Sequence, residues 1–291
     1  MSQIDQNALG TLLLAGNNNE TVYVPNSGNA GDSLIAEATY QFLDDISLRY
    51  TTAKLTDTLP GRRRVIVGGG GNLVGPYRNV RNFLDRNLDL FDELIILPHT
   101  IQAHEDVLAK LDERCTLICR EQRSFDFTRA AAPRAKVLLG DDMALLWNPE
   151  KTRTRAHKAM MSHIADPAFD LRNLKHTVRR VLHRGKVQGG TLNAFRLDVE
   201  SRNSSVPEGN IDLSQVFATD SMSPAHSACA IHALAQFIDR ADIVRSDRLH
   251  ISILSAALGK KVEMHDNNYG KNRSVYDHSL ASRFPNITFV S

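Results

Sequence analysis

Short apolar segments rich in β-branched residues alternate along this chain with longer amphipathic ones, and this alternation is its strongest constraint on the fold. The pattern is typical of α/β proteins, in which helices connect the strands of a parallel sheet. A helix is expected over 33–43, with Asp32 placed to cap its start. The strands expected in the first half, each followed by a polar or glycine-rich turn, are 21–24, 65–67, 94–97, 116–119 and 136–139.

The alternation stops between residues 148 and 190 and then resumes. The basic, aperiodic run 151–158 predicts a linker, which a basic helix around 174–183 follows. A second α/β unit is expected from residue 191 onward. Its strands are expected at 191–197, 241–244, 261–264 and 287–290, and its helices at 224–240 and 249–258.

The length of 291 residues suits two domains of ordinary size. We expect a Rossmann-like domain with glycine-rich loops over 1–150, a linker with a basic helix over 151–190, and a second Rossmann-like domain over 191–291. Ligands of such folds bind beyond the carboxyl ends of the strands. The chain is therefore interpreted as two α/β domains that face a cleft.

The composition excludes several classes of protein. A net charge of +2 argues against a dedicated nucleic-acid binder, which would present a strongly basic face. Residues 1–10 lack the pattern of a signal peptide, and no apolar stretch approaches the roughly 20 residues that span a bilayer. We expect a cytoplasmic protein that can touch the inner face of the membrane. No spacing of His, Cys and Asp residues demands a metal, and no cofactor is expected.

The most informative candidate for a site is the segment 246–250, Ser-Asp-Arg-Leu-His, where a short strand is expected to lead into a helix. Arg248 and His250 are thus placed at a helix N-terminus, where free backbone N–H groups and the helix dipole favour an anion. A second polar run, 266–273, contributes Asn267, Tyr269, Lys271 and Arg273. Together the two segments predict a site for a small, negatively charged ligand.

Two glycine-containing turns in the first half are further candidates. In the turn 26–32, Asn29 and Gly31 lie where the backbone can approach a ligand, and Asp32 offers a carboxylate. An ordinary turn with a helix cap explains this segment equally well. The second turn is a run of four glycines, 68–71, that Asn72 follows. Its candidate residues are Gly69, Gly70, Gly71 and Asn72. Because it matches neither a P-loop nor a dinucleotide fingerprint, close backbone packing and the binding of an anion or a sugar both stay open.

Basic side chains are concentrated at the expected strand ends. His99 and Arg120 each close a strand of the first half, and Arg196 lies beside Asp198 in the second. An isolated histidine is more often structural, and a surface pair of Arg120 with Glu121 is a commoner arrangement than an arginine that captures carboxylate or phosphate. Taken together, however, these residues indicate a ligand site.

Seven segments in order along the chain carry a resemblance to a known family: 29–35, 67–73, 97–101, 120–124, 195–198, 246–250 and 266–272. They resemble the polysaccharide pyruvyl transferases, and most closely the bacterial exopolysaccharide enzymes of that family. Two residues depart from the family pattern. Ile251 stands where the family usually has glycine, and His99 stands where it commonly has glutamine.

The resemblance implies a two-domain, GT-B-like fold and a reaction that attaches pyruvate from phosphoenolpyruvate to two hydroxyls of a sugar as a ketal. It implies phosphoenolpyruvate as the donor substrate and an oligosaccharide as the acceptor, which we expect to be lipid-linked. Arg248, Leu249 and His250 match the Arg-Leu-His stretch that binds the donor in the family. Arg120 matches a donor-binding arginine of the first domain.

The remaining candidates receive roles in the expected reaction. Lys271 and Arg273 can supply cations for the carboxylate and phosphate of the donor. His250 is the candidate general acid, because histidine titrates near neutral pH, and Asp32 is the candidate that accepts a hydroxyl proton or orients the acceptor. Residues assigned to the acceptor or to the loops around it are Asn29, Gly31, Gly69, Gly70, Gly71, Asn72, His99, Arg196, Asn267 and Tyr269.

Two other functions stay open on the sequence alone. One is a nucleotide-sugar glycosyltransferase of the same fold, whose thermal stability would respond to nucleotide sugars and not to phosphoenolpyruvate. The other is a non-catalytic carbohydrate-binding member of a biosynthetic complex, which would bind sugar without turnover. Ile251 is the feature that favours the second alternative, whereas the seven motifs favour the transferase.

Overall fold

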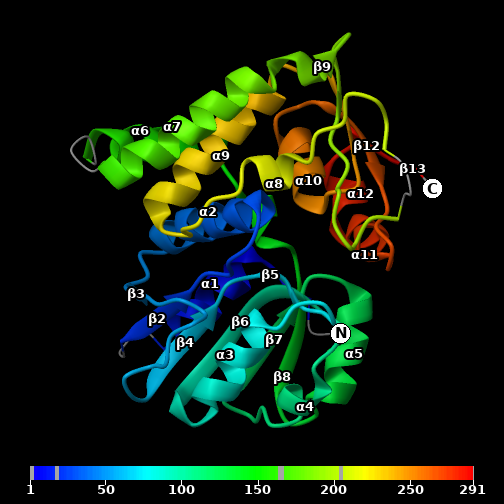
Figure 1. Ribbon diagram of the computed structural model, residues 1–291. Helices are drawn as coiled ribbons and strands as arrows, with labels where there is room; N and C mark the ends of the chain where they lie inside the picture. The colour runs from blue at the N-terminus through cyan, green and yellow to red at the C-terminus, as the bar shows by residue number, and fades with distance from the viewer. Residues whose placement is uncertain (1–2, 17–19, 163–166, 203–205, 291) are drawn as a thin grey trace. The chain divides into compact units, whose positions relative to one another are not determined.

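The structure is a computed structural model that describes residues 3–16, 20–162, 167–202 and 206–290 (Figure 1). Contacts between Cα atoms divide the chain into two compact units. Unit 1 comprises residues 1–26 and 39–146, and unit 2 comprises residues 27–38 and 147–291. The short segment 27–38, which the sequence placed in the first domain, thus belongs to unit 2.

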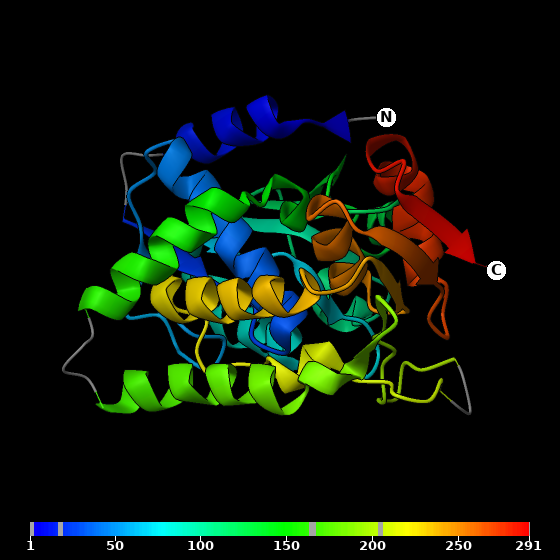
Figure 2. The same ribbon diagram turned by 90° about the horizontal axis from the view of Figure 1, so that it is seen from above.

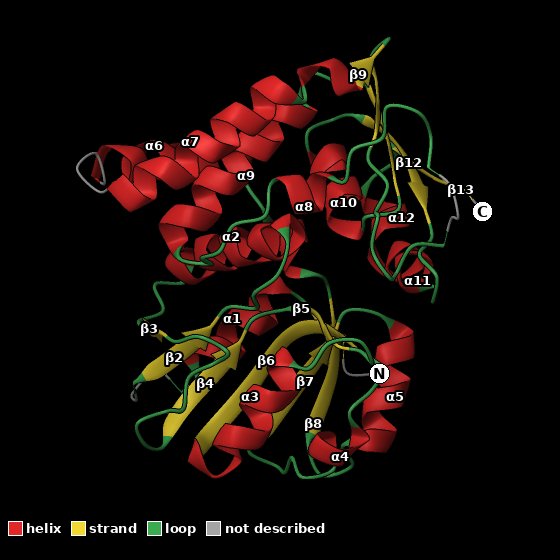
Figure 3. Cartoon of the chain, in the orientation of Figure 1, coloured by secondary structure: helices red, strands yellow, loops and turns green. Residues whose placement is uncertain are grey.

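Unit 1 is built on a parallel sheet whose described strands number eight (Figure 3). The strand order is β1-β8-β7-β6-β4-β2-β3, and β5 pairs with β6. The strands are β1 (Gln3–Ile4), β2 (Thr21–Val24), β3 (Thr51–Thr52), β4 (Arg63–Val67), β5 (Gly70–Leu73), β6 (Phe91–Ile101), β7 (Cys115–Cys119) and β8 (Lys136–Gly140). The helices are α1 (Gln6–Leu14), α2 (Ala30–Asp45), which begins in unit 2, α3 (Asn79–Asn87), α4 (Glu105–Leu108) and α5 (Gln122–Ala131).

Unit 2 carries a smaller sheet in the order β13-β12-β11-β10-β9. Its pairs are parallel except for β9, which runs antiparallel to β10. The strands are β9 (Val187–Gln188), β10 (Thr191–Asn193), β11 (Ile243–Ser246), β12 (Lys261–His265) and β13 (Ile287–Val290). The helices are α6 (Pro149–Ser162), α7 (Pro167–Leu182), α8 (Leu213–Val216), α9 (Pro224–Ile238), α10 (Leu249–Ala257), α11 (Lys271–Val275) and α12 (Ala281–Arg283).

The predicted α/β fold is confirmed, and most predicted strands agree with the observed ones within two residues. β2 coincides with the expected strand 21–24. The exceptions are β6, which extends beyond the predicted strand 94–97 at both ends, and β10, which ends at Asn193 instead of residue 197. The backbone N–H groups of residues 195–197 donate to side chains and not to a neighbouring strand.

The segment 148–190 differs in part from our expectation, because the run 151–158 expected as a linker lies in α6. The basic helix expected around 174–183 corresponds to the C-terminal half of α7, and both helices pack against α9. The buried face of α6 consists of Thr152, Ala156 and Ala159, at intervals of four and three residues. Such small side chains give almost no hydrophobic periodicity, which explains why the sequence did not indicate this helix. No helix of the described ranges combines the length and the apolar composition needed to cross a membrane.

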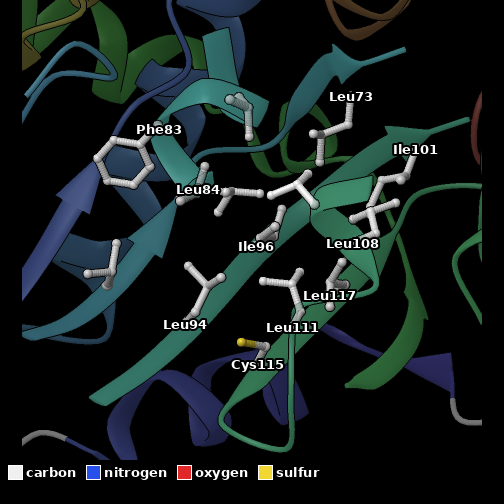
Figure 4. Packing of buried hydrophobic residues seen from close by; sticks show 14 of the residues in the cluster. Leu73, Phe83, Leu84, Leu94, Ile96, Ile101, Leu108, Leu111, Cys115 and Leu117 are labelled. Atoms are coloured by element: carbon white, nitrogen blue, oxygen red, sulfur yellow. The ribbon is translucent and has the colours of Figure 1, made fainter. Parts of the chain in front are cut away.

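The core of unit 1 lies between the sheet and helices α3, α4 and α5. Figure 4 shows Phe83 and Leu84 of α3 close to Leu94 and Ile96 of β6, together with Leu117 of β7. All five side chains are fully buried. β6 is buried without interruption from Leu94 to Ile101, as expected for a parallel strand with neighbours on both edges and helices over the sheet.

β6 changes its partner near its middle. It pairs with β4 as far as Ile96 and with β5 from His99 onward, and its register with β7 shifts over the same two residues. Pro98 lies in this irregular stretch, where its missing N–H group costs no ladder hydrogen bond. The change of partner brings His99 beside Gly70.

Backbone packing explains two of the four consecutive glycines. A Cβ atom on Gly68 would lie 2.8 Å from the backbone nitrogen of Asn26 and 3.2 Å from the Cα atom of Pro25. Gly70 has a φ angle of 145°, which side-chain-bearing residues rarely adopt. That Gly69 and Gly71 contact a ligand stays a prediction.

We predict that Gly68→Ala lowers the free energy of unfolding by about 2 kcal/mol, because the new methyl group must push apart two backbone segments. The matched control is Gly75→Ala, since a Cβ atom there would meet nothing within 4 Å. The control should change stability by less than about 0.5 kcal/mol. Urea denaturation followed by circular dichroism measures both values, and equal stability of the two variants would contradict the close approach at Gly68.

Candidate functional site

The candidate residues of unit 1 meet at the carboxyl ends of its strands. The backbone N–H of Asn72 donates a hydrogen bond to Nε2 of His99 at 3.0 Å. The side-chain amide of Asn72 donates to Oδ1 of Asn26, which follows β2. The structure therefore brings Asn72 and His99 into direct contact and adds Asn26, which the sequence analysis did not single out.

His99 is a neutral, fully buried side chain. Since its Nε2 atom accepts a hydrogen bond, the ring proton resides on Nδ1. Burial, together with the positive charge of Arg120, lowers the pKa of His99 to about 3, although the backbone of Gly68 acts in the opposite direction. His99 consequently positions the glycine-rich loop through Asn72 and does not carry a charge at neutral pH.

Arg120 is buried in an ion pair. Its Nη1 atom lies 2.7 Å from Oδ2 of Asp142, and each side chain is 1% exposed. Its Nε atom donates to Oγ1 of Thr100 at 2.9 Å. A Cβ atom on Gly71 would lie 3.4 Å from Nη2, so the glycine-rich loop lies against the guanidinium group. A buried arginine requires such partners, because an unpaired charge in the interior is strongly destabilising.

The alternative of a surface pair between Arg120 and Glu121 is wrong. Both residues are buried. The Glu121 carboxylate accepts a hydrogen bond from the backbone N–H of Ser124 at 3.0 Å and caps α5, while Asp142 after β8 pairs with Arg120. No local pattern in the sequence pointed to Asp142, because its partner lies 22 residues away.

In unit 2 the candidate residues form a connected group of charged side chains at the carboxyl ends of β10 and β11 and in the segment after β12. We call it the unit 2 network, and its members are Arg196, Asp198, Glu200, Asp212, Asp247, Arg248 and Lys271. Arg248 is 5% exposed and makes ion pairs with two carboxylates. Its Nε atom donates to Oδ1 of Asp212 at 3.1 Å, and its Nη2 atom lies 2.7 Å from Oδ2 of Asp198.

Arg196 shares one of these carboxylates. Its Nε atom lies 2.7 Å from Oδ1 of Asp198, and its Nη1 atom lies 2.7 Å from Oε2 of Glu200. Burial opposes the ionised form of Asp198, yet the hydrogen bond from Arg196 and the charge of Arg248 hold its pKa below the usual value. Asp198 therefore bridges two arginines as an ionised carboxylate.

Glu200 gathers three of the predicted residues. Its Oε2 atom accepts hydrogen bonds from Nζ of Lys271 at 3.0 Å, from the Tyr269 hydroxyl at 3.1 Å and from the Asn267 amide at 3.3 Å. The sequence analysis missed Glu200. The segment 194–200 is not helical, so the spacing of four residues between Arg196 and Glu200 gave no signal in the sequence.

Hydrogen bonds to the backbone hold the strand ends of the network in place. The Ser246 hydroxyl donates to the carbonyl of Ala194 at 2.7 Å and accepts from the N–H of Arg248 at 3.0 Å. Oδ1 of Asp247 accepts from the N–H of Arg196 at 2.8 Å. These bonds tie the end of β10 to the turn between β11 and α10, so the backbone of both arginines is fixed.

The charges of the network oppose the binding of an anionic ligand unless one of its carboxylates moves away. Four carboxylates face three cations, and burial raises the pKa of one of them, Asp247, to about 6. Asp198 is 26% exposed, whereas Asp212 is 5% exposed. Asp198 is thus the more accessible of the two carboxylates on Arg248. Within the described part of the chain, no group of three or more His, Cys, Asp or Glu residues is arranged to hold a metal ion.

The first turn of α2 lies against His250. A Cβ atom on Gly31 would lie 2.7 Å from Nδ1 of His250 and 3.2 Å from its Cβ atom. The Asn29 side chain accepts from the N–H of Gly31 at 2.8 Å, and Oδ2 of Asp32 accepts from the N–H of Asn29 at 2.9 Å. This is the reciprocal pattern of a capping box. Asn29 is therefore the helix cap that we had assigned to Asp32, and the segment 27–38 that holds both residues belongs to unit 2, as His250 does.

Two residues of the expected site, Arg273 and Leu249, lie outside the unit 2 network. Arg273 is 51% exposed and pairs with Asp277 at 2.8 Å, so the structure does not bring it into the unit 2 network. Leu249 and Ile251 are both buried in α10. The departure from the family pattern at Ile251 leaves this helix regular.

The comparisons with known proteins agree with this architecture. The family model described as polysaccharide pyruvyl transferase matches residues 29–262, and the chain belongs to that family. The resemblance inferred from the seven motifs is confirmed. The family name describes transfer of a pyruvyl group on a polysaccharide, and this is the class of activity to which the chain is assigned.

Two individual proteins illustrate the relationship. The chain is 23% identical over 324 residues to a protein of Bacillus subtilis (strain 168) named "Putative pyruvyl transferase EpsO", with 100% of the chain and 94% of that protein covered. It is also similar to the crystal structure of a functional uncharacterized protein, KP1_0663, from Klebsiella pneumoniae subsp. pneumoniae NTUH-K2044. That comparison gives a TM-score of 0.75 and 27% sequence identity, with 97% of each chain covered.

We predict that His99→Gln removes part of the pH dependence of stability. The pKa of His99 is about 3 in the folded protein and near 6.5 in an unfolded chain, so the unfolded state binds the proton first as the pH falls. The wild type should therefore lose on the order of 2 kcal/mol of stability between pH 7 and pH 5 through this residue alone. Glutamine offers Asn72 an oxygen acceptor and does not titrate. Denaturation at both pH values tests this, and an equal loss of stability in wild type and variant would contradict it.

Proposed function

We propose that the protein transfers pyruvate from phosphoenolpyruvate to two hydroxyls of one sugar residue of a cell-surface or extracellular polysaccharide, where it forms a ketal. The observation that carries the proposal is the arrangement around Arg248. Its guanidinium group lies at the carboxyl end of β11, next to the N-terminus of α10, and already binds carboxylate oxygens. A donor that carries a carboxylate and a phosphate offers the same kind of oxygen atoms.

Donor binding requires that one carboxylate leaves Arg248. Asp212 contacts both Nε and Nη2 of the guanidinium group and is almost fully buried, so it is suited to hold the group in one orientation. Asp198 contacts only Nη2 and is partly exposed. In our proposal an anionic group of phosphoenolpyruvate replaces Asp198 at Arg248, while Asp212 remains. Two like charges cannot share the position, since their repulsion is large in a partly buried site.

The proposed reaction forms two C–O bonds at one carbon atom and releases inorganic phosphate. One sugar hydroxyl attacks the central carbon of phosphoenolpyruvate, and a proton is added to the methylene carbon, which becomes a methyl group. The second hydroxyl forms another C–O bond to the same carbon as the bond to phosphate breaks. The proton of the first hydroxyl restores the general acid that has protonated the methylene carbon, and the proton of the second hydroxyl leaves with the inorganic phosphate. His250 is the proposed donor of the first proton, and Asp32, three residues from Asn29 in the same capping box, is the proposed group that orients or deprotonates a hydroxyl.

The rest of the expected site belongs to this proposal as well. Lys271, held by Glu200, is proposed to contribute positive charge to the donor, and Tyr269 and Asn267 are proposed to contact the acceptor. From the family resemblance we retain a GT-B-like arrangement of two α/β domains, a donor-binding role for Arg120 and a lipid-linked acceptor.

We predict that the purified protein, incubated with phosphoenolpyruvate and an oligosaccharide acceptor, releases phosphate and yields a sugar whose mass has increased by a carboxyethylidene group. His250→Gln should lower kcat by about 100-fold, the usual scale for losing a positioned general acid, with little change in the KM for phosphoenolpyruvate. The matched control is His232→Gln, because His232 lies on α9 and contacts Gln236 at 3.0 Å. Mass spectrometry and a phosphate assay measure the two products.

The proposal fails if no acceptor is pyruvylated, or if His250→Gln and His232→Gln are equally active. Transfer of a sugar from a nucleotide sugar would identify a glycosyltransferase. Binding of the oligosaccharide without any product would identify a carbohydrate-binding protein.

A further inference from the structure

Helix α7 presents a stripe of large apolar side chains to solvent. Leu174, Val178, Val181 and Leu182 are 56%, 43%, 62% and 73% exposed. Their spacing of four, three and one residues places them on one face of the helix. We call these four residues the α7 stripe. Single exposed apolar residues are common on protein surfaces, but a continuous row of this kind marks an interaction surface.

The stripe is not the face that attaches α7 to unit 2. Phe169 and His176 are buried on the other side of the helix. Phe169 packs in a cluster with Ala228 and Cys229 of α9, and the ring of His176 stacks on Phe217 with centroids 6.2 Å apart. In Figure 2, α7 runs along an edge of unit 2 beside α9. The helix therefore has one apolar face for the core of unit 2 and a second, exposed one.

Positive charge is concentrated in the segment that carries the stripe. Residues 167–186 contain six Lys and Arg residues and one Asp, a net charge of +5, whereas the whole chain has a net charge of +2. Lys175 and Arg184 are exposed next to the stripe. Arg179 is half-buried, and its Nη1 atom donates to the carbonyl of Ala218 at 3.2 Å.

This combination selects one kind of partner. A helix with an exposed apolar face and cations beside it is suited to lie in the interface of a bilayer that contains anionic lipids. A second copy of the chain would bring two segments of charge +5 together, which electrostatic repulsion disfavours. We infer that the α7 stripe and its neighbouring cations dock unit 2 on an anionic membrane surface. This inference does not depend on the proposed transfer of pyruvate.

The test is flotation of the full-length protein with lipid vesicles. The wild type should bind vesicles that contain phosphatidylglycerol and bind poorly to pure phosphatidylcholine. The double variant Val181→Asp/Leu182→Asp should bind at least about tenfold more weakly, because it removes apolar contact and adds negative charge. The matched control is Leu14→Asp on α1, since Leu14 is also exposed, at 39%, but lies in unit 1.

A second variant separates the electrostatic contribution. Lys175→Glu/Arg184→Glu should weaken binding to anionic vesicles and reduce its dependence on salt, since two of the attracting cations are reversed. Circular dichroism establishes that each variant is folded. Absence of wild-type binding to anionic vesicles, or equal binding by wild type and Val181→Asp/Leu182→Asp, would overturn the inference. A wild-type dimer that the same variant converts to a monomer, without vesicle binding, would show that the stripe joins two copies instead.

Discussion

The pairing of Arg248 with Asp198 and Asp212 is the interaction on which the organisation of unit 2 depends. A guanidinium group that is only 5% exposed must be matched by carboxylates, because loss of one partner of a buried ion pair costs about 3–5 kcal/mol. Its partners come from the segment after β10 and from the residue before α8, far from Arg248 in the sequence. This one charge therefore fixes the path of two loops and directs the turn between β11 and α10.

Both units place a buried arginine at the carboxyl end of a strand and neutralise it with an aspartate. In unit 1 the pair is Arg120 with Asp142, and in unit 2 it is Arg248 with Asp212. The arrangement in unit 2 is suited to the proposed chemistry, because Asp212 keeps the guanidinium group in one orientation while a second anion takes the place of Asp198. Asp198, the partly exposed carboxylate on Arg248, is the group that we propose to be exchanged.

Local patterns in the sequence predicted the features that depend on local physics. Nine of the thirteen described strands, the helix at α2 and the placement of Arg120 and Arg248 at strand ends followed from apolar periodicity, and the family followed from seven short motifs. Helix α6 escaped prediction because Ala156 and Ala159 pack without a hydrophobic signature. Asp142 and Asp212 also escaped it, since an ion pair across 22 or 36 residues leaves no trace in the neighbouring sequence. The glycine run was ambiguous for a related reason, because the close approach at Gly68 is a long-range contact.

The central claim is that Arg248 binds the donor, and a calorimetric titration with phosphoenolpyruvate tests it most directly. Arg248→Lys should weaken binding at least about tenfold, because lysine cannot form the forked contact of a guanidinium group. Arg245→Lys is the matched control, since Arg245 lies on β11 three residues before Arg248, is 43% exposed and pairs with Glu263 at 2.7 Å, and it should bind like the wild type. Equal affinity of wild type and Arg248→Lys would contradict the account.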